Sequence, residues 1–138
     1  MKVIIDTNVF ISALKSSRGA SFRLFKLLGY NKFAVCISVP LIFEYDDVAK
    51  RRGMLQITTQ QIDDIIDYIC LVGEKTEIFY LWRPVLSDPK DDFVLELAVN
   101  ASADYIVTFN KKDFIKGEKL FNIKTVTPQE FLKIIGDI

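Results

Sequence analysis

The sequence predicts an α/β protein with a doubly wound parallel sheet. Short apolar runs that suit buried strands alternate along the chain with longer segments whose apolar residues recur at helical spacing. The runs near the start of the chain are apolar on both faces, which is typical of strands inside a parallel sheet. At 138 residues the chain is long enough to bury a core, and we expect residues 1–138 to form one domain.

The first half of the chain predicts two strands and three helices. The strands are expected at residues 2–5 and 33–38, and the helices at residues 7–14, 21–28 and 40–51. In the second of these helices, Phe22, Phe25 and Leu28 form one stripe, and Gly29 ends it. Pro40 suits the first turn of the third helix, because its fixed φ is helical and it has no N–H to leave unpaired.

The second half continues the alternation. Strands are expected at residues 77–81, 105–108 and 123–126, and helices at residues 58–72 and 91–101 and from residue 127 onward. The helix at 58–72 is amphipathic, with isoleucines on one face and acids on the other. The last helix begins with a capping box, in which Thr127 is the cap, Pro128 the first helical residue and Glu130 the third.

The composition excludes several kinds of site. Lys and Arg number 18, as do Asp and Glu, so the net charge is zero and bulk charge cannot drive binding to a polyanion. There is no histidine, which excludes Ser-His-Asp and Cys-His catalysis and histidine-ligated zinc. The polar chemistry that remains is carboxylate chemistry.

The cysteines and the hydropathy indicate a cytoplasmic protein. Cys36 and Cys70 both lie in apolar stretches and form no Cys-x-x-Cys pair, so we expect buried free thiols in a reducing compartment. The amino terminus lacks the apolar core of a signal peptide, and no apolar run is long enough to span a membrane. We therefore expect no association with a membrane.

Asp6 is the strongest candidate for a functional residue. It follows the first buried strand directly and begins the first helix. A carboxylate in that place is partly desolvated and needs a cation, a donor or a proton. The carboxyl ends of parallel strands are also where α/β proteins bind ligands.

Three further polar residues are expected near Asp6. Glu44 and Asp92 lie near the starts of their helices, and Asn110 follows the strand that ends at Thr108. Three carboxylates and an amide suit Mg²⁺ or Mn²⁺, because these hard cations prefer oxygen ligands. Such an ion activates a bound water and neutralises charge that develops on a phosphodiester, without any histidine.

Each of these residues, taken alone, also has a structural interpretation. Asp92 would stabilise a helix dipole, and Asn110 would suit a turn. Glu44 has acidic neighbours, which suggests a solvated face. Lys111 and Lys112 follow Asn110 and are candidates to contact a substrate phosphate, although lysines of this kind are usually only solvated.

Four segments in order resemble the PIN-domain nuclease family. Residues 3–9 resemble the opening motif, residues 40–52 the segment of the second acid, residues 88–98 that of the third, and residues 103–110 the fourth. Each motif is weak alone, but four in this order at family-like spacing are specific, and the likeness runs nearly end to end. The branch that it resembles contains the toxin components of toxin–antitoxin pairs.

The resemblance implies a three-layer α/β/α sandwich and a divalent-metal-dependent endoribonuclease, with RNA as substrate and an antitoxin protein as partner. Asp6, Glu44 and Asp92 match the family's acids, and Asn110 matches a position that is often Asp. Asn8 matches a residue that supports the first acid, and Thr108 matches a small hydroxyl residue near the metal. Asp91 competes with Asp92 for the third role, and the spacing to Asn110 favours Asp92.

Two other functions stay open. A phosphatase of the haloacid-dehalogenase type also has an Asp after its first strand, but that family needs a second Asp where this chain has Asn8. A PIN fold kept as a non-catalytic module that binds RNA or protein is the stronger alternative. We also expect a homodimer, because the helix at 58–72 carries more isoleucine than one core face needs.

Overall fold

The computed structural model describes residues 1–79, 86 and 88–137. The strands are β1 (Lys2–Ile5), β2 (Ala34–Ile37), β3 (Glu74–Lys75), β4 (Tyr105–Val107) and β5 (Lys124–Val126). The helices are α1 (Thr7–Lys15), α2 (Ala20–Lys26), α3 (Val39–Ala49), α4 (Thr59–Val72), α5 (Pro89–Asn100), α6 (Ile115–Phe121) and α7 (Pro128–Ile134). A short 3₁₀ helix, η1 (Lys111–Phe114), precedes α6.

The described strands form one five-stranded sheet in the order β3-β2-β1-β4-β5, and all neighbouring pairs are parallel. The chain passes from β1 outward to β2 and β3, and then returns to the other side of β1 to form β4 and β5. β1 and β4 are therefore neighbours at the point where the strand order reverses, which is where open α/β sheets bind ligands. The predicted doubly wound parallel sheet is confirmed.

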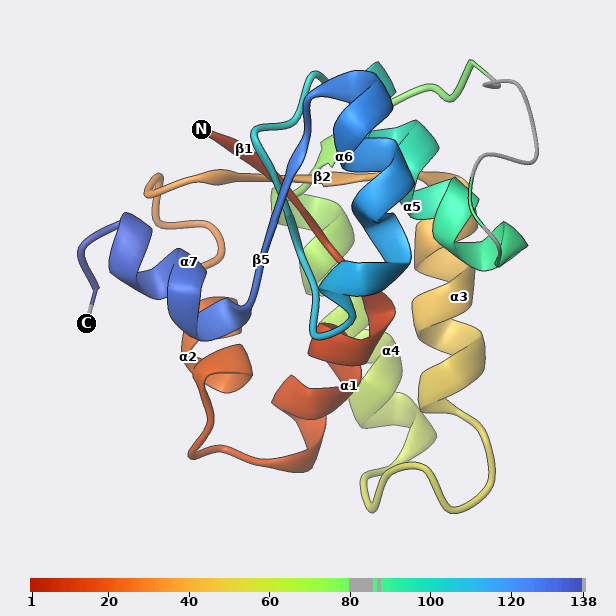
Figure 1. Ribbon diagram of the computed structural model, residues 1–138. Helices are drawn as coiled ribbons and strands as arrows, with labels where there is room; N and C mark the ends of the chain where they lie inside the picture. Colours follow the sequence, from red (N-terminus) through yellow and green to blue (C-terminus); the bar gives the residue numbers. More distant parts are fainter. Residues whose placement is uncertain (80–85, 87, 138) are drawn as a thin grey trace.

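Helices cover both faces of the sheet (Figure 1). α5 and α6 lie on one face, and α1, α2, α4 and α7 lie on the other. This division follows from right-handed crossovers, because the connections on either side of β1 run in opposite directions across the sheet. The three-layer α/β/α sandwich is confirmed.

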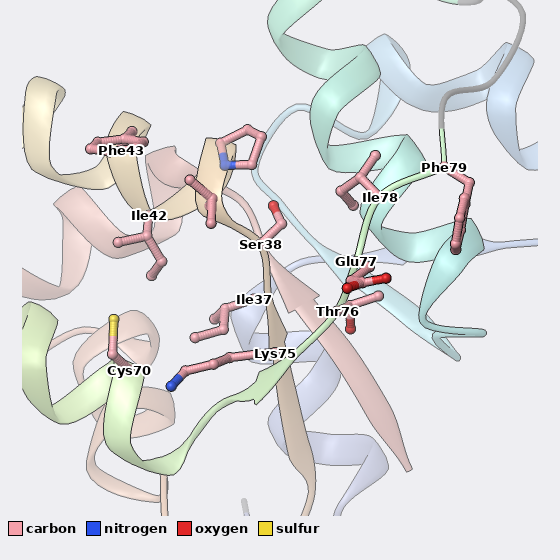
Figure 2. A pocket seen from close by; sticks show the side chains of 12 residues that line it. Ile37, Ser38, Ile42, Phe43, Cys70, Lys75, Thr76, Glu77, Ile78 and Phe79 are labelled. Atoms are coloured by element: carbon pink, nitrogen blue, oxygen red, sulfur yellow. The ribbon is translucent and has the colours of Figure 1, made fainter.

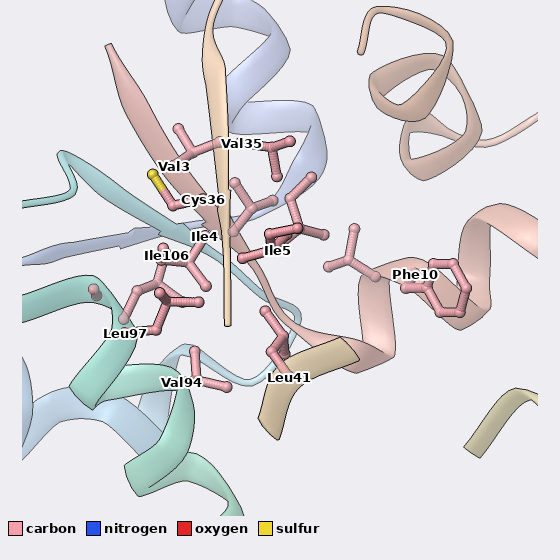
Figure 3. Close-up of a cluster of buried hydrophobic side chains, with 14 of the residues drawn as sticks. Val3, Ile4, Ile5, Phe10, Val35, Cys36, Leu41, Val94, Leu97 and Ile106 are labelled. Carbon is pink, nitrogen blue, oxygen red and sulfur yellow. The ribbon is translucent and has the colours of Figure 1, made fainter. Parts of the chain in front are cut away.

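The core fills the space between the sheet and these helices (Figure 3). Ile4 and Ile106 lie opposite each other on β1 and β4 and are fully buried, and Leu97 of α5 belongs to the same cluster. Phe10 of α1 stacks on Tyr45 of α3 with ring centroids 4.4 Å apart. This packing fixes the first turn of α1 against the sheet.

Local sequence signals account for the helix starts. The Ser38 side chain accepts a hydrogen bond from the backbone of Leu41 at the start of α3. The expected capping box of Thr127 and Glu130 is present at α7, and Thr58 begins α4 in the same way. These bonds satisfy amide groups that the first turn of a helix leaves unpaired.

The third strand lies earlier than the sequence predicts. We expected it at residues 77–81, but β3 is Glu74–Lys75; residues 77–79 are outside any strand, and residues 80 and 81 lie outside the described part of the chain. Gly73 explains the early start, because a Cβ there would lie 2.8 Å from the carbonyl oxygen of Ile69. The chain therefore passes close to α4 and enters the sheet at once.

The apolar face of α4 packs against the core of its own chain and is not left over for a partner. Ile62, Ile66 and Ile69 are buried in the core of the same chain, and Ile65 is half-buried against it. The reason that the sequence offered for a homodimer is therefore wrong, although the homodimer itself is not tested by this packing. The cysteines are free, and no described helix has the length and apolar character to cross a membrane.

Candidate functional site

Asp6 joins β1, α1 and β4 at the carboxyl edge of the sheet. Its backbone N–H donates to the carbonyl of Val107, 2.9 Å away, which continues the ladder between β1 and β4. Its Oδ1 accepts a hydrogen bond from the backbone of Thr7 at 2.8 Å, so that Asp6 caps α1. Its Oδ2 accepts one from the hydroxyl of Thr108 at 2.8 Å. The carboxylate is thus held from the first residue of α1 and from the residue that follows β4.

Asn8 connects the same two strands a second time. Its Nδ2 lies 3.4 Å from both Asp6 Oδ2 and Thr108 Oγ1, and its Oδ1 accepts a hydrogen bond from the backbone of Phe109 at 3.3 Å. The backbone N–H of Asn110 donates to Thr108 Oγ1 at 3.0 Å. These contacts suit the supporting roles that the sequence assigns to Asn8 and Thr108.

Burial and neighbouring acids control the ionisation of Asp6. Burial raises its pKa from 3.8 to about 6, although the hydrogen bonds from Thr108 and Thr7 act in the opposite direction. The charges of Glu44 and Asp113 make smaller contributions to this rise in pKa. Asp6 is therefore a carboxyl group for which a cation would be a favourable neighbour.

The two adjacent acids of α5 take different roles. Asp92 is buried, and its Oδ1 accepts a hydrogen bond from the backbone of Leu86 at 2.9 Å. Asp91 is half-buried, and its pKa is raised from 3.8 to about 7 by burial and then by the charges of acids that include Asp6 and Glu44. The sequence favoured Asp92 as the third acid, whereas the structure brings Asp91 into the electrostatic reach of Asp6.

Asp113 is an acid of this group that the sequence analysis missed. It lies on η1, one 3₁₀ turn beyond Asn110, with its backbone N–H 3.0 Å from the Asn110 carbonyl. Its charge raises the pKa of both Asp6 and Asp91. The available signal was the three-residue spacing from Asn110, which places the two residues on the same side of a 3₁₀ turn.

Asn110, Lys111 and Lys112, which follow β4, differ in their exposure and in their contacts. Asn110 is exposed, and its backbone rather than its side chain contacts the network around Asp6. Lys111 forms an ion pair with Glu130 of α7, with Nζ 3.0 Å from Oε1. Lys112 is exposed, and no ion pair involves it among the described residues. Of the two lysines proposed for phosphate binding, Lys112 is the one that forms no ion pair with an acid in the described part of the chain.

The acids form an open group rather than a closed set of ligands. Within residues 1–79, 86 and 88–137, no three Asp, Glu or Cys side chains come close enough to hold a metal ion between them as they stand. The charges of Glu44 and Asp113 contribute to the raised pKa values of Asp6 and Asp91, and that of Asp88 contributes to the raised pKa of Asp91. We call Asp6, Glu44, Asp91 and Asp113 the acidic group. Their oxygen atoms have the chemistry that Mg²⁺ and Mn²⁺ prefer.

The PIN domain profile matches residues 2–112 of this chain. No curated protein sequence matches this chain. The fold is similar to a chain in the crystal structure of VapBC2 from Rickettsia felis bound to a DNA fragment from their promoter, with a TM-score of 0.60 and 16% identity over 92% of this chain and 98% of that one.

Two further structures are similar over a comparable length. A chain of VapBC-1 from nontypeable Haemophilus influenzae has a TM-score of 0.61 and 13% identity, covering 94% of this chain and 99% of that one. A chain of FitAB bound to an IR36 DNA fragment has a TM-score of 0.59 and 14% identity, covering 91% and 94%. At these identities the likeness shows the fold, while the profile match over most of the chain shows the family. The chain belongs to the PIN domain family.

Proposed function

We propose that this protein is a divalent-metal-dependent endoribonuclease of the cytoplasm and the toxin component of a toxin–antitoxin pair. The observation that carries the proposal is the position of Asp6, which is buried, held by Thr7 and Thr108, and surrounded by the charges of Glu44, Asp91 and Asp113. Membership in the PIN family supports the same reaction class. A purely structural role would not require two carboxyl groups with raised pKa values, Asp6 and Asp91, beside further acids.

The acidic group has the right donors for Mg²⁺ or Mn²⁺. Asp6 and Asp91 would hold the ion, with Glu44 and Asp113 near it, while Asp92 keeps its hydrogen bond to Leu86. When bound, the ion supplies an activated water and neutralises charge on the phosphate. The protein supplies position, since Thr7, Thr108 and Asn8 fix the carboxylate of Asp6.

Single-stranded RNA is the substrate that the surface near the site suits best. Phe109 directly follows Thr108, its backbone is held by Asn8, and the residue is 48% exposed. An exposed aromatic ring beside the reacting phosphate would stack on an unpaired base. Lys112 would contact a neighbouring phosphate, which offsets the repulsion between RNA and the acidic group.

The antitoxin part of the proposal rests on the family branch and on the similar folds in VapBC and FitAB, which are toxin–antitoxin complexes. The acidic group would attract an Arg or Lys from a partner segment, which would then occupy the place of the metal. Co-purification with the product of the neighbouring gene, and inhibition of RNA cleavage by that product, are the expected results.

The decisive experiment compares the wild type and Asp6→Asn, purified identically, on single-stranded RNA with Mn²⁺ or with EDTA. Loss of Asp6 is expected to reduce the rate by roughly a thousandfold or more, which corresponds to about 4 kcal/mol of barrier. Equal cleavage in all four samples would identify a contaminating nuclease. RNA binding without cleavage by the wild type would instead favour the non-catalytic module.

A further inference from the structure

The segment formed by η1 and α6 carries a row of lysines on its outer side. Lys112, Lys116 and Lys119 are exposed and follow one another at intervals of four and three residues. Residues with this spacing lie on one side of a helix. Among the described residues, no ion pair involves any of these three lysines, which we call the lysine row.

The other side of the segment packs against the fold. Gly117 is buried, and a Cβ there would lie 2.8 Å from a methyl carbon of Leu95 on α5. The acids of the segment have other partners, since Glu118 accepts a hydrogen bond from the hydroxyl of Thr125 and Asp113 belongs to the acidic group. The lysine row is therefore left without a counter-charge from its own segment.

Folding stability does not explain the lysine row. Like charges four and three residues apart on a helix repel one another and destabilise it. Lys116 is also the second residue of α6, where the helix dipole disfavours a positive charge. These lysines cost stability where they stand, which points to a negatively charged ligand.

RNA needs a local positive surface on this protein. The net charge of the chain is zero and the acidic group repels phosphate, so bulk charge cannot hold a strand. A groove of about 690 Å³ between α3, α4 and the end of β3 does not supply such a surface (Figure 2). Ile42, Cys70 and Ile78 line it, and its charged lining residues are Lys75 and Glu77, one of each sign.

The lysine row begins beside the acidic group and leads away from it. Lys112 lies between Asn110 and Asp113, just after β4. α6 then runs beside α5 along one face of the sheet (Figure 1). At about 1.5 Å per residue the row is about 10 Å long. Phosphates of a stacked strand are about 3.4 Å apart along its axis, so the row spans about three such intervals.

We propose that the lysine row holds the backbone of single-stranded RNA where the strand leaves the acidic group. This inference rests on the proposed ribonuclease function and extends it. Phe109 and Lys112 hold the nucleotides at the site, whereas Lys116 and Lys119 bind phosphates farther along the same strand. Lysine contacts to phosphate carry no sequence information, so the row supplies affinity for longer strands without a preference for particular bases.

The double variant Lys116→Gln with Lys119→Gln, which we call the row variant, tests this role. It removes two charges and keeps Lys112, which the proposed function already uses. Both side chains are exposed, so Gln fits at either position. Because neighbouring lysines repel, the row variant should melt no lower than the wild type, which excludes a lost fold as the cause of weaker binding.

The matched control is Lys26→Gln with Lys133→Gln, which has the same net charge as the row variant. Both control lysines are exposed, and neither forms an ion pair in the described part of the chain. They lie on α2 and α7, on the face of the sheet opposite to α6 (Figure 1). Lys26 also lines a hollow of about 670 Å³ beside Arg23, so the control tests that surface as well.

Binding is measured by fluorescence anisotropy with a labelled single-stranded RNA of about 16 nucleotides in EDTA, so that cleavage does not interfere. The row variant is expected to bind roughly tenfold or more weakly than the wild type. Each phosphate contact with a single strand contributes about 0.7 to the slope of log affinity against log salt, so the slope should become shallower by about 1.4. The control variant should keep the affinity and the slope of the wild type.

Cleavage with Mn²⁺ separates the lysine row from the site. On the same RNA, the row variant should raise KM by roughly tenfold and leave kcat unchanged, because the row holds the strand and not the reacting phosphate. A dinucleotide has a single phosphodiester and cannot reach the row from the site. The wild type and the row variant should therefore cleave it equally.

The outcomes distinguish this inference from the proposed function. Weaker binding, a shallower salt slope and a raised KM in the row variant alone support the lysine row. Cleavage by the wild type with unchanged binding and KM in the row variant overturns the row and leaves the ribonuclease intact. Binding that depends on the row, without cleavage, supports the row and favours the non-catalytic module. Equal losses in the row and control variants, or a wild type that binds no RNA, overturn the row.

Discussion

Replacing Asp6 by Asn should stabilise the metal-free protein at neutral and higher pH. The pKa of Asp6 is raised from 3.8 to about 6, chiefly by burial. Each pKa unit corresponds to about 1.4 kcal/mol, so keeping this carboxylate ionised in the fold costs about 3 kcal/mol above about pH 7. Asn carries no charge and avoids this cost.

The substitution also changes the hydrogen bonds of residue 6. Asn retains one acceptor oxygen for the backbone of Thr7, and its amide group can donate to the hydroxyl oxygen that now donates to Asp6. We assign a cost of about 1 kcal/mol to this change of hydrogen bonds. The net stabilisation is therefore about 2 kcal/mol, which should raise the melting temperature by roughly 6 °C for a chain of this size.

The pH dependence gives the sign of the effect. Because folding raises the pKa of Asp6, its contribution to stability is complete below the unfolded pKa of 3.8 and is lost as the pH rises through about 6. Below about pH 4 the ionisation cost is absent and only the hydrogen-bond cost remains, so Asp6→Asn should lose its advantage and be about 1 kcal/mol less stable than the wild type. Melting curves in EDTA across this range measure it. Asp67→Asn, at an exposed residue of α4 without an ion pair among the described residues, is the matched control.

A parallel pH dependence of the wild type and Asp6→Asn would refute the reasoning, since the cost would then not come from this carboxylate. Millimolar Mg²⁺ adds a second arm, because an ion that binds only the folded state stabilises it. It should raise the melting temperature of the wild type and leave Asp6→Asn unchanged. An unshifted wild type would count against the acidic group as a metal site.

Two other predictions concern α5 and the residue after Thr108. Asp91→Ala should lower RNA cleavage by at least about a hundredfold, close to 3 kcal/mol of barrier, without loss of stability. Asp92→Ala should instead destabilise the fold by about 1–3 kcal/mol, because it leaves the N–H of Leu86 without its acceptor. Melting and cleavage assays on both variants separate the loss of stability from the loss of activity. If Asp92→Ala lost cleavage and Asp91→Ala lost stability, Asp92 would be the third acid. Phe109→Ala should raise KM for single-stranded RNA by roughly tenfold or more, with Phe109→Tyr as the control that keeps the ring, and an unchanged KM would exclude stacking.

Much of the fold was predictable because the strong signals were local. Buried strands such as β1 are apolar on both faces, and the cap at Thr127 is written in adjacent residues. β3 was misplaced because an edge strand needs no apolar side chains. Ile78 and Phe79 looked like a strand, but the pairing with β2 uses Glu74 and Lys75, both exposed. A Cβ at Gly73 would also lie 3.1 Å from the Ile37 side chain of β2, and that approach between distant parts of the chain is a tertiary property.

The acidic group was predictable at Asp6 and less so elsewhere. Adjacent residues of a helix point about 100° apart, so the choice between Asp91 and Asp92 depends on the rotation of α5. That rotation is difficult to read, because α5 is buried on several sides and its apolar pattern does not mark one face. Asp113 depends on a 3₁₀ turn after β4, and no side chain caps the start of that turn to mark it in the sequence.

The hydrogen bond from Thr108 to Asp6 joins the two central strands of the sheet. Local opening of a peripheral element, such as α7 or the edge at β3, would leave this bond intact, because β1 and β4 separate only when the whole domain unfolds. Fraying of a peripheral element therefore does not displace this carboxylate, whereas local opening of a surface loop would displace a residue on that loop. If the protein is the nuclease proposed above, the folded chain would be controlled by another molecule that occupies the site or by degradation, and reactivation after such occupancy would require only release of the occupant.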